Sequence, residues 1–83
     1  MKNTYNGWKN RQTWNVALYI GNNYNLYKAA CEYMAAHPKH IAPYMGFVKS
    51  YGLVDVRTND NISFSGSRLD YKALNEFMRE LVA

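Results

Sequence analysis

Hydrophobic residues in the first half of the chain recur every three or four positions, the spacing that places them on one face of an α-helix. In the first such stretch this face is formed by Thr13, Trp14, Ala17, Leu18 and Ile20. In the second stretch it is formed by Leu26, Ala29, Ala30, Tyr33 and Met34. Asn10 is suited to cap the first helix, Gly21 to end it, and Pro38 to end the second. We therefore predict helices over residues 10–21 and 24–36.

Two further helical stretches follow in the second half. Pro43 fits the first position of a helix over residues 43–51, and Gly52 follows it as a C-terminal cap. The clearest periodicity comes last, where Asp70 is a suitable cap for a helix over residues 70–81. The apolar face of this last helix consists of Leu74, Phe77, Met78 and Leu81.

The pattern changes between these helices, over residues 53–66. Here Val54 and Val56 alternate with polar residues, as do Ile62 and Phe64 further on. Alternation is typical of strands, and Asn59-Asp60 between the two runs has the chemistry of a turn. A short β-hairpin fits this pattern. An ordered loop that pins two apolar side chains onto the helices fits it equally.

Together these elements predict a mainly α fold, a compact single domain of four short helices over residues 1–83, with a hairpin or ordered loop at 53–66. The core is expected to consist of apolar residues from the helical faces. Its expected members are Trp14, Leu18, Leu26, Ala30, Phe47, Val48, Leu74, Phe77 and Leu81.

The opposite side of the first predicted helix is unusual for an exposed surface. It carries a stripe at helical spacing, extended by Lys9 just ahead of the helix: Arg11, Asn15, Tyr19 and Asn22. Exposed helix positions normally favour good helix formers such as Ala, Glu or Lys, whereas Asn is a poor helix former. The stripe and Lys9 are therefore a candidate partner-binding surface. Alternatively, the stripe serves the fold, with Tyr19 packing beneath the N-terminal turn and Asn15 bonding to the NGW segment before the helix.

Composition narrows the class of protein. The chain has 83 residues, of which 48% are hydrophobic and 19% charged, so it is apolar enough to fold and long enough for one domain. Its single cysteine, Cys31, excludes an internal disulfide and fits a reducing compartment. The longest apolar run, Val16 to Ile20, is far shorter than the roughly 18 residues of a membrane span. With no apolar segment resembling a signal peptide at the N-terminus, we expect a cytoplasmic protein without membrane association.

The charge distribution points to a polyanion as one candidate partner. The net charge is +4, and all the charged residues before Glu32 are cations: Lys2, Lys9, Arg11 and Lys28. These cations lie among aromatic residues and asparagines, which could stack on bases and hydrogen-bond to the backbone of DNA or RNA. The other interpretation is that the charge serves solubility.

Candidate catalytic residues are few. Cys31, His37 and His40 could be imagined as a thiolate–imidazole pair or a partial zinc site, but a second cysteine and an HExxH helix are both absent. The serines around Gly66 do not form a nucleophile elbow. We expect no enzymatic activity, no metal and no cofactor.

The segment NGWKNRQTWNVALYIGN, residues 6–22, resembles the start of a family of small uncharacterised proteins found in phages, plasmids and their bacterial hosts. Members begin with an N-G-W/F-x-N-x-x-T-W-N-V-A-L-W/Y-I type segment and end with a helix like LDYKALNEFMREL. Residues 30–65 lie outside the resemblance. It implies a compact, mainly helical fold and a mobile-element context, and it brings no catalytic residues.

From these observations we expect a non-catalytic phage-type protein, a monomer or small homo-oligomer, that binds a host protein or nucleoprotein complex. Small phage proteins often inhibit host machinery in this way, CRISPR effectors included. The alternative is an accessory DNA- or RNA-binding protein that uses the basic N-terminal half. A homo-oligomeric structural factor is a third interpretation.

Overall fold

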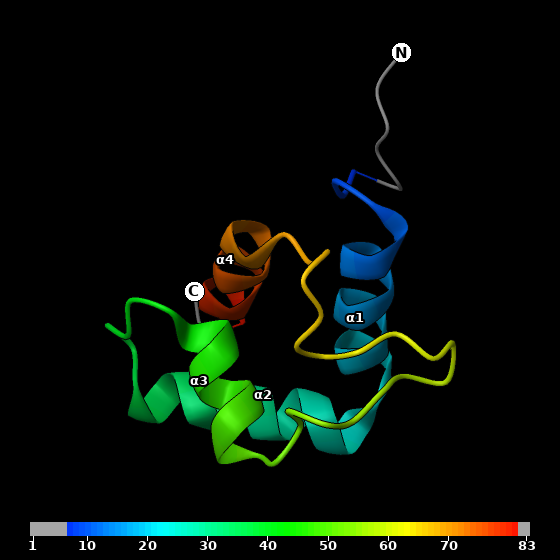
Figure 1. Ribbon diagram of the computed structural model, residues 1–83. Coiled ribbons are helices and arrows are strands. Elements are labelled where there is room, and N and C mark those ends of the chain that lie inside the picture. The colour runs from blue at the N-terminus through cyan, green and yellow to red at the C-terminus, as the bar shows by residue number, and fades with distance from the viewer. Residues whose placement is uncertain (1–6, 82–83) are drawn as a thin grey trace.

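Four α-helices make up the fold of this protein, whose computed structural model describes residues 7–81. They are α1 (Arg11–Asn22), α2 (Tyr24–Ala36), α3 (Pro43–Ser50) and α4 (Tyr71–Glu80), shown in Figure 1. Each observed helix begins and ends within one residue of its predicted bounds. The mainly α fold class is confirmed.

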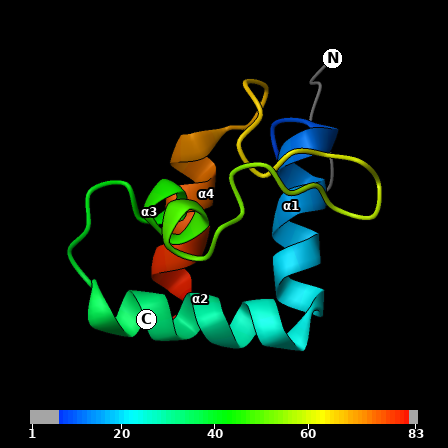
Figure 2. The same cartoon turned by 60° about the horizontal axis from the view of Figure 1, so that its bottom comes forward.

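Polar side chains at the helix ends explain why the bounds could be predicted. The side chain of Asn10 accepts a hydrogen bond from the N–H of Thr13 at the start of α1, at 2.9 Å. Asn23 ends α1 through its own backbone N–H and caps α2 through its side chain. Because this single residue separates the two helices, α1 and α2 meet at a sharp corner (Figure 2). Asp70 caps α4 in the same manner.

The segment between α3 and α4 is an ordered loop. Among the described residues it contains one isolated antiparallel bridge, between Arg57 and Ser63, and no strand. The N–H of Thr58 donates to the carbonyl of Ile62 at 2.9 Å, which closes the tip of the loop. Asn61 adopts a left-handed conformation there, with φ of 65°. In both Figure 1 and Figure 2 this loop crosses α1 before it returns to α4.

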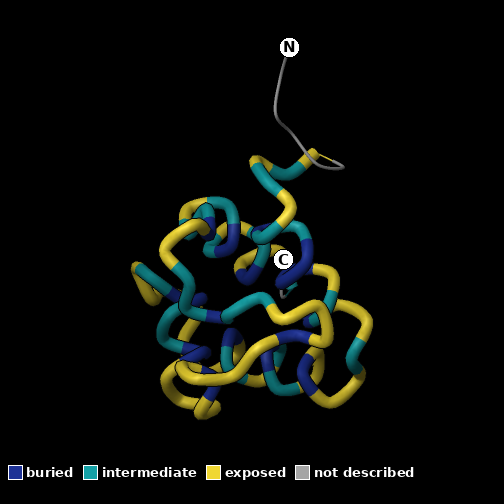
Figure 3. The backbone as a smooth tube through the Cα atoms, turned by 45° about the vertical axis from the view of Figure 1, so that its right-hand side comes forward, coloured by how far each residue is buried: buried dark blue, intermediate teal, exposed yellow. Residues whose placement is uncertain are grey.

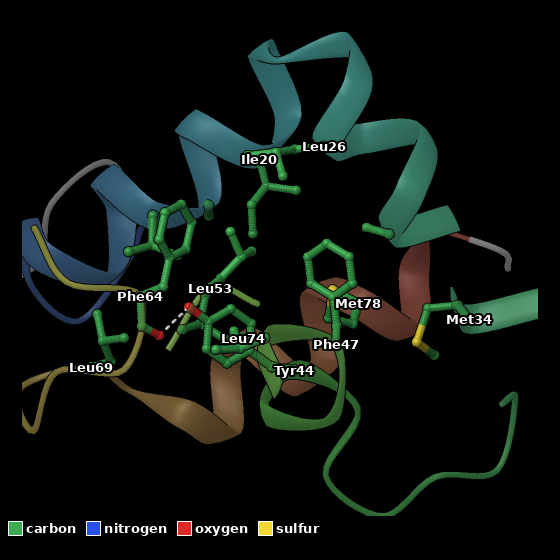
Figure 4. Close-up of a cluster of buried hydrophobic side chains, with 14 residues drawn as sticks. Ile20, Leu26, Met34, Tyr44, Phe47, Leu53, Phe64, Leu69, Leu74 and Met78 are labelled. Carbon is green, nitrogen blue, oxygen red and sulfur yellow. Dashed lines mark hydrogen bonds between the residues drawn. The ribbon is translucent and has the colours of Figure 1, made fainter. Parts of the chain in front are cut away.

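The core lies where the loop and the four helices converge (Figure 4). Five of the residues predicted for it are buried: Leu26, Ala30, Phe47, Val48 and Leu74. Phe77 and Leu81 are partly buried and pack against it. Phe64 from the loop is fully buried in the core, as expected for an ordered loop that pins an apolar ring onto the helices.

The predicted core positions on α1 require a correction. Trp14 is only half-buried and Leu18 is 42% exposed, whereas Val16 and Ile20 are fully buried. Figure 3 shows the resulting pattern of buried and exposed positions along the chain. The buried face is rotated around α1 relative to the prediction, because the loop covers the side of the helix that contains Asn15.

Two tyrosine hydroxyls tie the loop to the helices beneath it. Tyr44 of α3 donates to the carbonyl of Phe64 at 2.6 Å, the dashed line in Figure 4. Tyr71 of α4 donates to the carbonyl of Gly66 at 2.6 Å. Burial, and secondarily the charge of Tyr71, raises the pKa of Tyr44 far above that of an exposed tyrosine. Both hydroxyls are therefore protonated, as donors to the loop carbonyls must be.

No helix within residues 7–81 is long and apolar enough to cross a membrane.

Candidate functional site

The start of α1 is joined to the start of α4 by a network of capping side chains. The hydroxyl of Thr13 donates to Asn10 Oδ1 at 2.7 Å and accepts the N–H of Asp70 at 2.9 Å. Asn10 Nδ2 also donates to the carbonyl of Arg68 at 2.7 Å. This network thus satisfies backbone groups at the starts of both helices and fixes the position of α1 relative to α4.

Asn15 joins α1 to the tip of the loop. Its side chain accepts a hydrogen bond from the Thr58 hydroxyl at 2.6 Å and donates to Asp60 Oδ2, also at 2.6 Å. Asn15 is 4% exposed, so its expected place on the open side of the helix is wrong. A buried amide must be hydrogen-bonded, and here the loop supplies both partners. Asn15 therefore serves the fold, through the loop and not through the NGW segment.

The other members of the predicted stripe are more exposed. Tyr19 is half-buried, and its ring meets that of Phe64 edge to face with centroids 5.9 Å apart. Arg11 lies 3.9 Å from Asp60 in an ion pair whose side chains are about half exposed, a type of pair that contributes little to stability. Lys9 and Asn22 are exposed.

The structure brings three of the predicted partner-binding residues to one hollow. Asn15, Tyr19 and Asn22 line it, together with Leu18 and loop residues 58–60. Its volume is about 280 Å³. The α1 side of this hollow could be foreseen from helical spacing, whereas the loop side could not.

A second hollow, of about 210 Å³, lies on the other side of Leu18. Its lining is mostly aromatic and small: Trp8, Trp14, Ala17, Leu18, Gly21, Asn22 and Phe77. The rings of Trp8 and Phe77 meet edge to face there, with centroids 6.0 Å apart. Leu18 and Asn22 line both hollows and form an exposed ridge between them, which we call the α1 ridge. The sequence does not reveal this ridge, because helical spacing places Leu18 on the apolar face.

The predicted nucleic-acid-binding cations do not form one cluster. Lys9 and Arg11 lie at the start of α1, whereas Lys28 is exposed on α2, beyond the far end of α1. Lys2 lies outside the described residues. The fold brings a further cation, Arg68, to the start of α1. Its carbonyl accepts a hydrogen bond from Asn10, the residue that follows Lys9.

The residues considered for catalysis are dispersed. The rings of His37 and His40 lie 6.4 Å apart on the α2–α3 connection, and Cys31 Sγ lies 4.0 Å from the carbonyl of Leu81 at the end of α4. Across residues 7–81, no group of three or more His, Cys, Asp or Glu side chains could hold a metal ion. The Ser65 hydroxyl donates to the carbonyl of Val54 at 2.6 Å and so serves the loop.

The fold and its surface define a class: a small all-α protein whose long loop is hydrogen-bonded across its first helix. The chain belongs to the family of unknown function DUF7249, whose profile matches residues 1–83. No curated protein and no solved structure matches it.

Proposed function

We propose that this protein is a small non-catalytic binding protein of the phage or mobile-element type, which docks on a host protein or nucleoprotein complex. Inhibition of a host defence system, such as a CRISPR effector, is the form of binding that we expect. One observation carries the proposal: the α1 ridge stands exposed between a hollow lined by Trp8, Trp14 and Phe77 and a more polar hollow that contains Tyr19. The resemblance of residues 6–22 to phage and plasmid proteins supports a host partner.

The chemistry of the ridge and its hollows suits a protein partner. Leu18 is 42% exposed at a helix position where the fold would accept a charged residue. Around it, Trp8, Trp14, Tyr19 and Phe77 offer large rings that are only partly buried. Such rings are enriched among the residues that dominate the energetics of protein interfaces. An apolar side chain of the partner would fill the aromatic hollow while Leu18 enters the partner's surface.

The rigidity of α1 supports the same proposal. Asn10 and Thr13 fasten its start to α4, and Asn15 fastens its middle to the loop. A surface held in place before binding loses little conformational entropy when a partner docks. The buried polar residues of α1 therefore contribute indirectly, by positioning the ridge.

The test uses Leu18→Glu in a tagged protein, with Val54→Glu as the matched control. Leu18 and Val54 are 42% and 41% exposed, so each change places a charge at an equally open site. We expect both variants to keep the melting temperature. We further expect a host protein captured from nuclease-treated lysate, and then its purified form in titration, to bind the wild type and Val54→Glu but not Leu18→Glu. A purified partner that binds Leu18→Glu as tightly as the wild type would contradict docking at the ridge.

Direct nucleic-acid binding is a second candidate function, and one observation favours it. The fold places Arg68, from the part of the chain in which acids balance cations, next to Lys9 and Arg11 at the start of α1. A local excess of positive charge attracts polyanions even where the net charge is modest. This function would use the first turn of α1, whereas the ridge lies toward the end of that helix.

A further inference from the structure

A third hollow, of about 290 Å³, lies between the first turn of α1 and the loop. Two arginines and several neutral polar residues contribute to its lining, among them Gln12, Arg57, Ser63, Ser67 and Arg68. None of the described residues that line it is acidic. The hollow therefore differs from the other sites on α1 in combining cations, amides and hydroxyls at a single concave surface.

Backbone interactions hold both arginines at this hollow, and a side-chain hydrogen bond also holds Arg57. Arg57 forms the antiparallel bridge with Ser63, and its Nη1 donates to the carbonyl of Asn61 at 3.0 Å. The carbonyl of Arg68 accepts a hydrogen bond from Asn10 at 2.7 Å. The two cationic side chains therefore start from fixed points on either side of the same hollow.

Neither arginine has an anionic partner among the described residues. The ion pair found there joins Arg11 to Asp60, and the side chain of Asp60 is turned toward Asn15. Two like charges at one concave surface repel each other unless an anion lies between them. The guanidinium fork matches the geometry of phosphate oxygens, and amides and hydroxyls commonly complete such contacts.

We propose that this hollow binds a phosphodiester group of a DNA or RNA backbone. The inference rests on the second candidate function and is independent of docking at the α1 ridge. A volume of about 290 Å³ lies just below the roughly 300–1,000 Å³ typical of ligand pockets, a size suited to one phosphate with part of its sugar. Exposed Lys9 and half-exposed Arg11 beside the hollow provide for the neighbouring phosphates of a chain, which a free phosphate ion would leave unused.

The decisive variant is Arg68→Gln, because only the backbone of Arg68 takes part in a hydrogen bond of the fold. Arg57→Gln is the second variant, and Arg57→Lys restores the charge there. Lys39→Gln on the α2–α3 connection is the matched control, since it removes one exposed cation that does not line the hollow. Binding of a labelled 20-nucleotide single strand and of a duplex is measured by fluorescence anisotropy over a salt series. Inorganic phosphate, ATP and polyglutamate serve as competitors, and melting temperatures verify the fold.

We expect binding to at least one of the two nucleic acids, with the slope of log K against log salt lowered by about one in Arg68→Gln and in Arg57→Gln. Lys39→Gln should keep the wild-type slope, and Arg57→Lys should recover it. Slopes that fall equally in Lys39→Gln and Arg68→Gln would overturn this site while nucleic-acid binding itself stands. Absence of binding at low salt would overturn both. Competition by polyglutamate as strong as by unlabelled DNA, or by phosphate or ATP at similar concentration, would show that the hollow takes another anion and would also overturn the proposal.

Discussion

At the scale of single residues, buried polar side chains hold the fold together, among them Asn15, which helical spacing had placed on a candidate binding surface. Thr13, Asn15 and Thr58 are buried, and each forms hydrogen bonds to a residue distant in sequence. Leaving such a group without its partner costs about 1–3 kcal/mol, more than the bond itself contributes in net terms. These residues therefore have strong structural roles without touching a ligand.

Tyr44 gives this argument a pH dependence. Burial raises the pKa of its hydroxyl well above the value of about 10 expected in the unfolded chain. The folded state thus keeps a proton that the unfolded state loses, so the stability contributed by Tyr44 is complete below pH 10 and declines above it. The expected decline is about 1.4 kcal/mol per pH unit for each such group.

Tyr44→Phe should flatten this alkaline decline, measured by urea unfolding at pH 8 to 11. At neutral pH it should cost about 1–3 kcal/mol, because the carbonyl of Phe64 loses its buried donor. Tyr71, whose pKa burial also raises, should leave a smaller dependence in place. Tyr24→Phe alters a ring that is 73% exposed and should keep the full decline. Equal slopes in Tyr44→Phe and the wild type would contradict the prediction.

At the scale of elements, the sequence determines helix bounds more visibly than helix faces. Asn10, Pro43 and Asp70 act within their own first turns, so the helices could be predicted to within one residue. The bond between Asn15 and Thr58 spans 43 residues, and no local pattern encodes it. The loop's path across α1 was therefore not predictable, nor was the rotation of the buried face that follows from it.

The candidate site, too, could be predicted only where its residues lie on one helix. Helical spacing alone placed Tyr19 and Asn22 on one side of α1, and they line one hollow. Arg57 and Arg68 lie among acidic residues in the sequence, so only the fold reveals that they share a hollow with Gln12. Contacts within one helix are readable from periodicity, whereas a site assembled from a helix and a distant loop is not.

The packing of α2 on α3 yields a prediction about Gly46. A Cβ at this position would collide with the hydroxyl of Tyr33 and would come within 3.1 Å of His40 Nε2. The Tyr33 ring is itself held against Phe47 and His37, with centroid distances of 6.0 and 4.5 Å. Gly46→Ala should therefore destabilise the protein by about 1–2 kcal/mol in chemical unfolding, despite the higher helix propensity of alanine.

Two variants verify the cause. Gly46→Ala should cost less when Tyr33→Phe has removed the hydroxyl, which makes the pair non-additive. Gly21→Ala on α1 meets no atom within 4 Å, so it should stabilise by up to about 1 kcal/mol. Additive effects of the changes at residues 33 and 46 would mean that the collision is relieved elsewhere.

At the scale of the whole molecule, the loop functions as a layer of the fold. Phe64 places a fully buried ring in the core, and Thr58 binds Asn15 across α1. The α4 helix packs against α1, α2 and α3. We therefore expect the loop tip to open while the helices remain folded, once its attachment to α1 is broken.

Native-state hydrogen exchange of Asn15→Ala tests this division of the molecule. In the wild type, the amides of Thr58 and Phe64 donate to Ile62 and Val56 at 2.9 and 3.2 Å, and should be protected despite lying outside regular structure. Removing the Asn15 side chain leaves the Thr58 hydroxyl without its acceptor and Asp60 with only its ion pair to Arg11, so protection of these two loop amides should fall about tenfold or more. Amides of α4 should lose less, because the helix keeps its own packing. Asn22→Ala, at an exposed position of the same helix, should change neither group. Equal losses in the loop and in α4 would show that the loop and the helices open only together, and that Asn15 supports the whole fold.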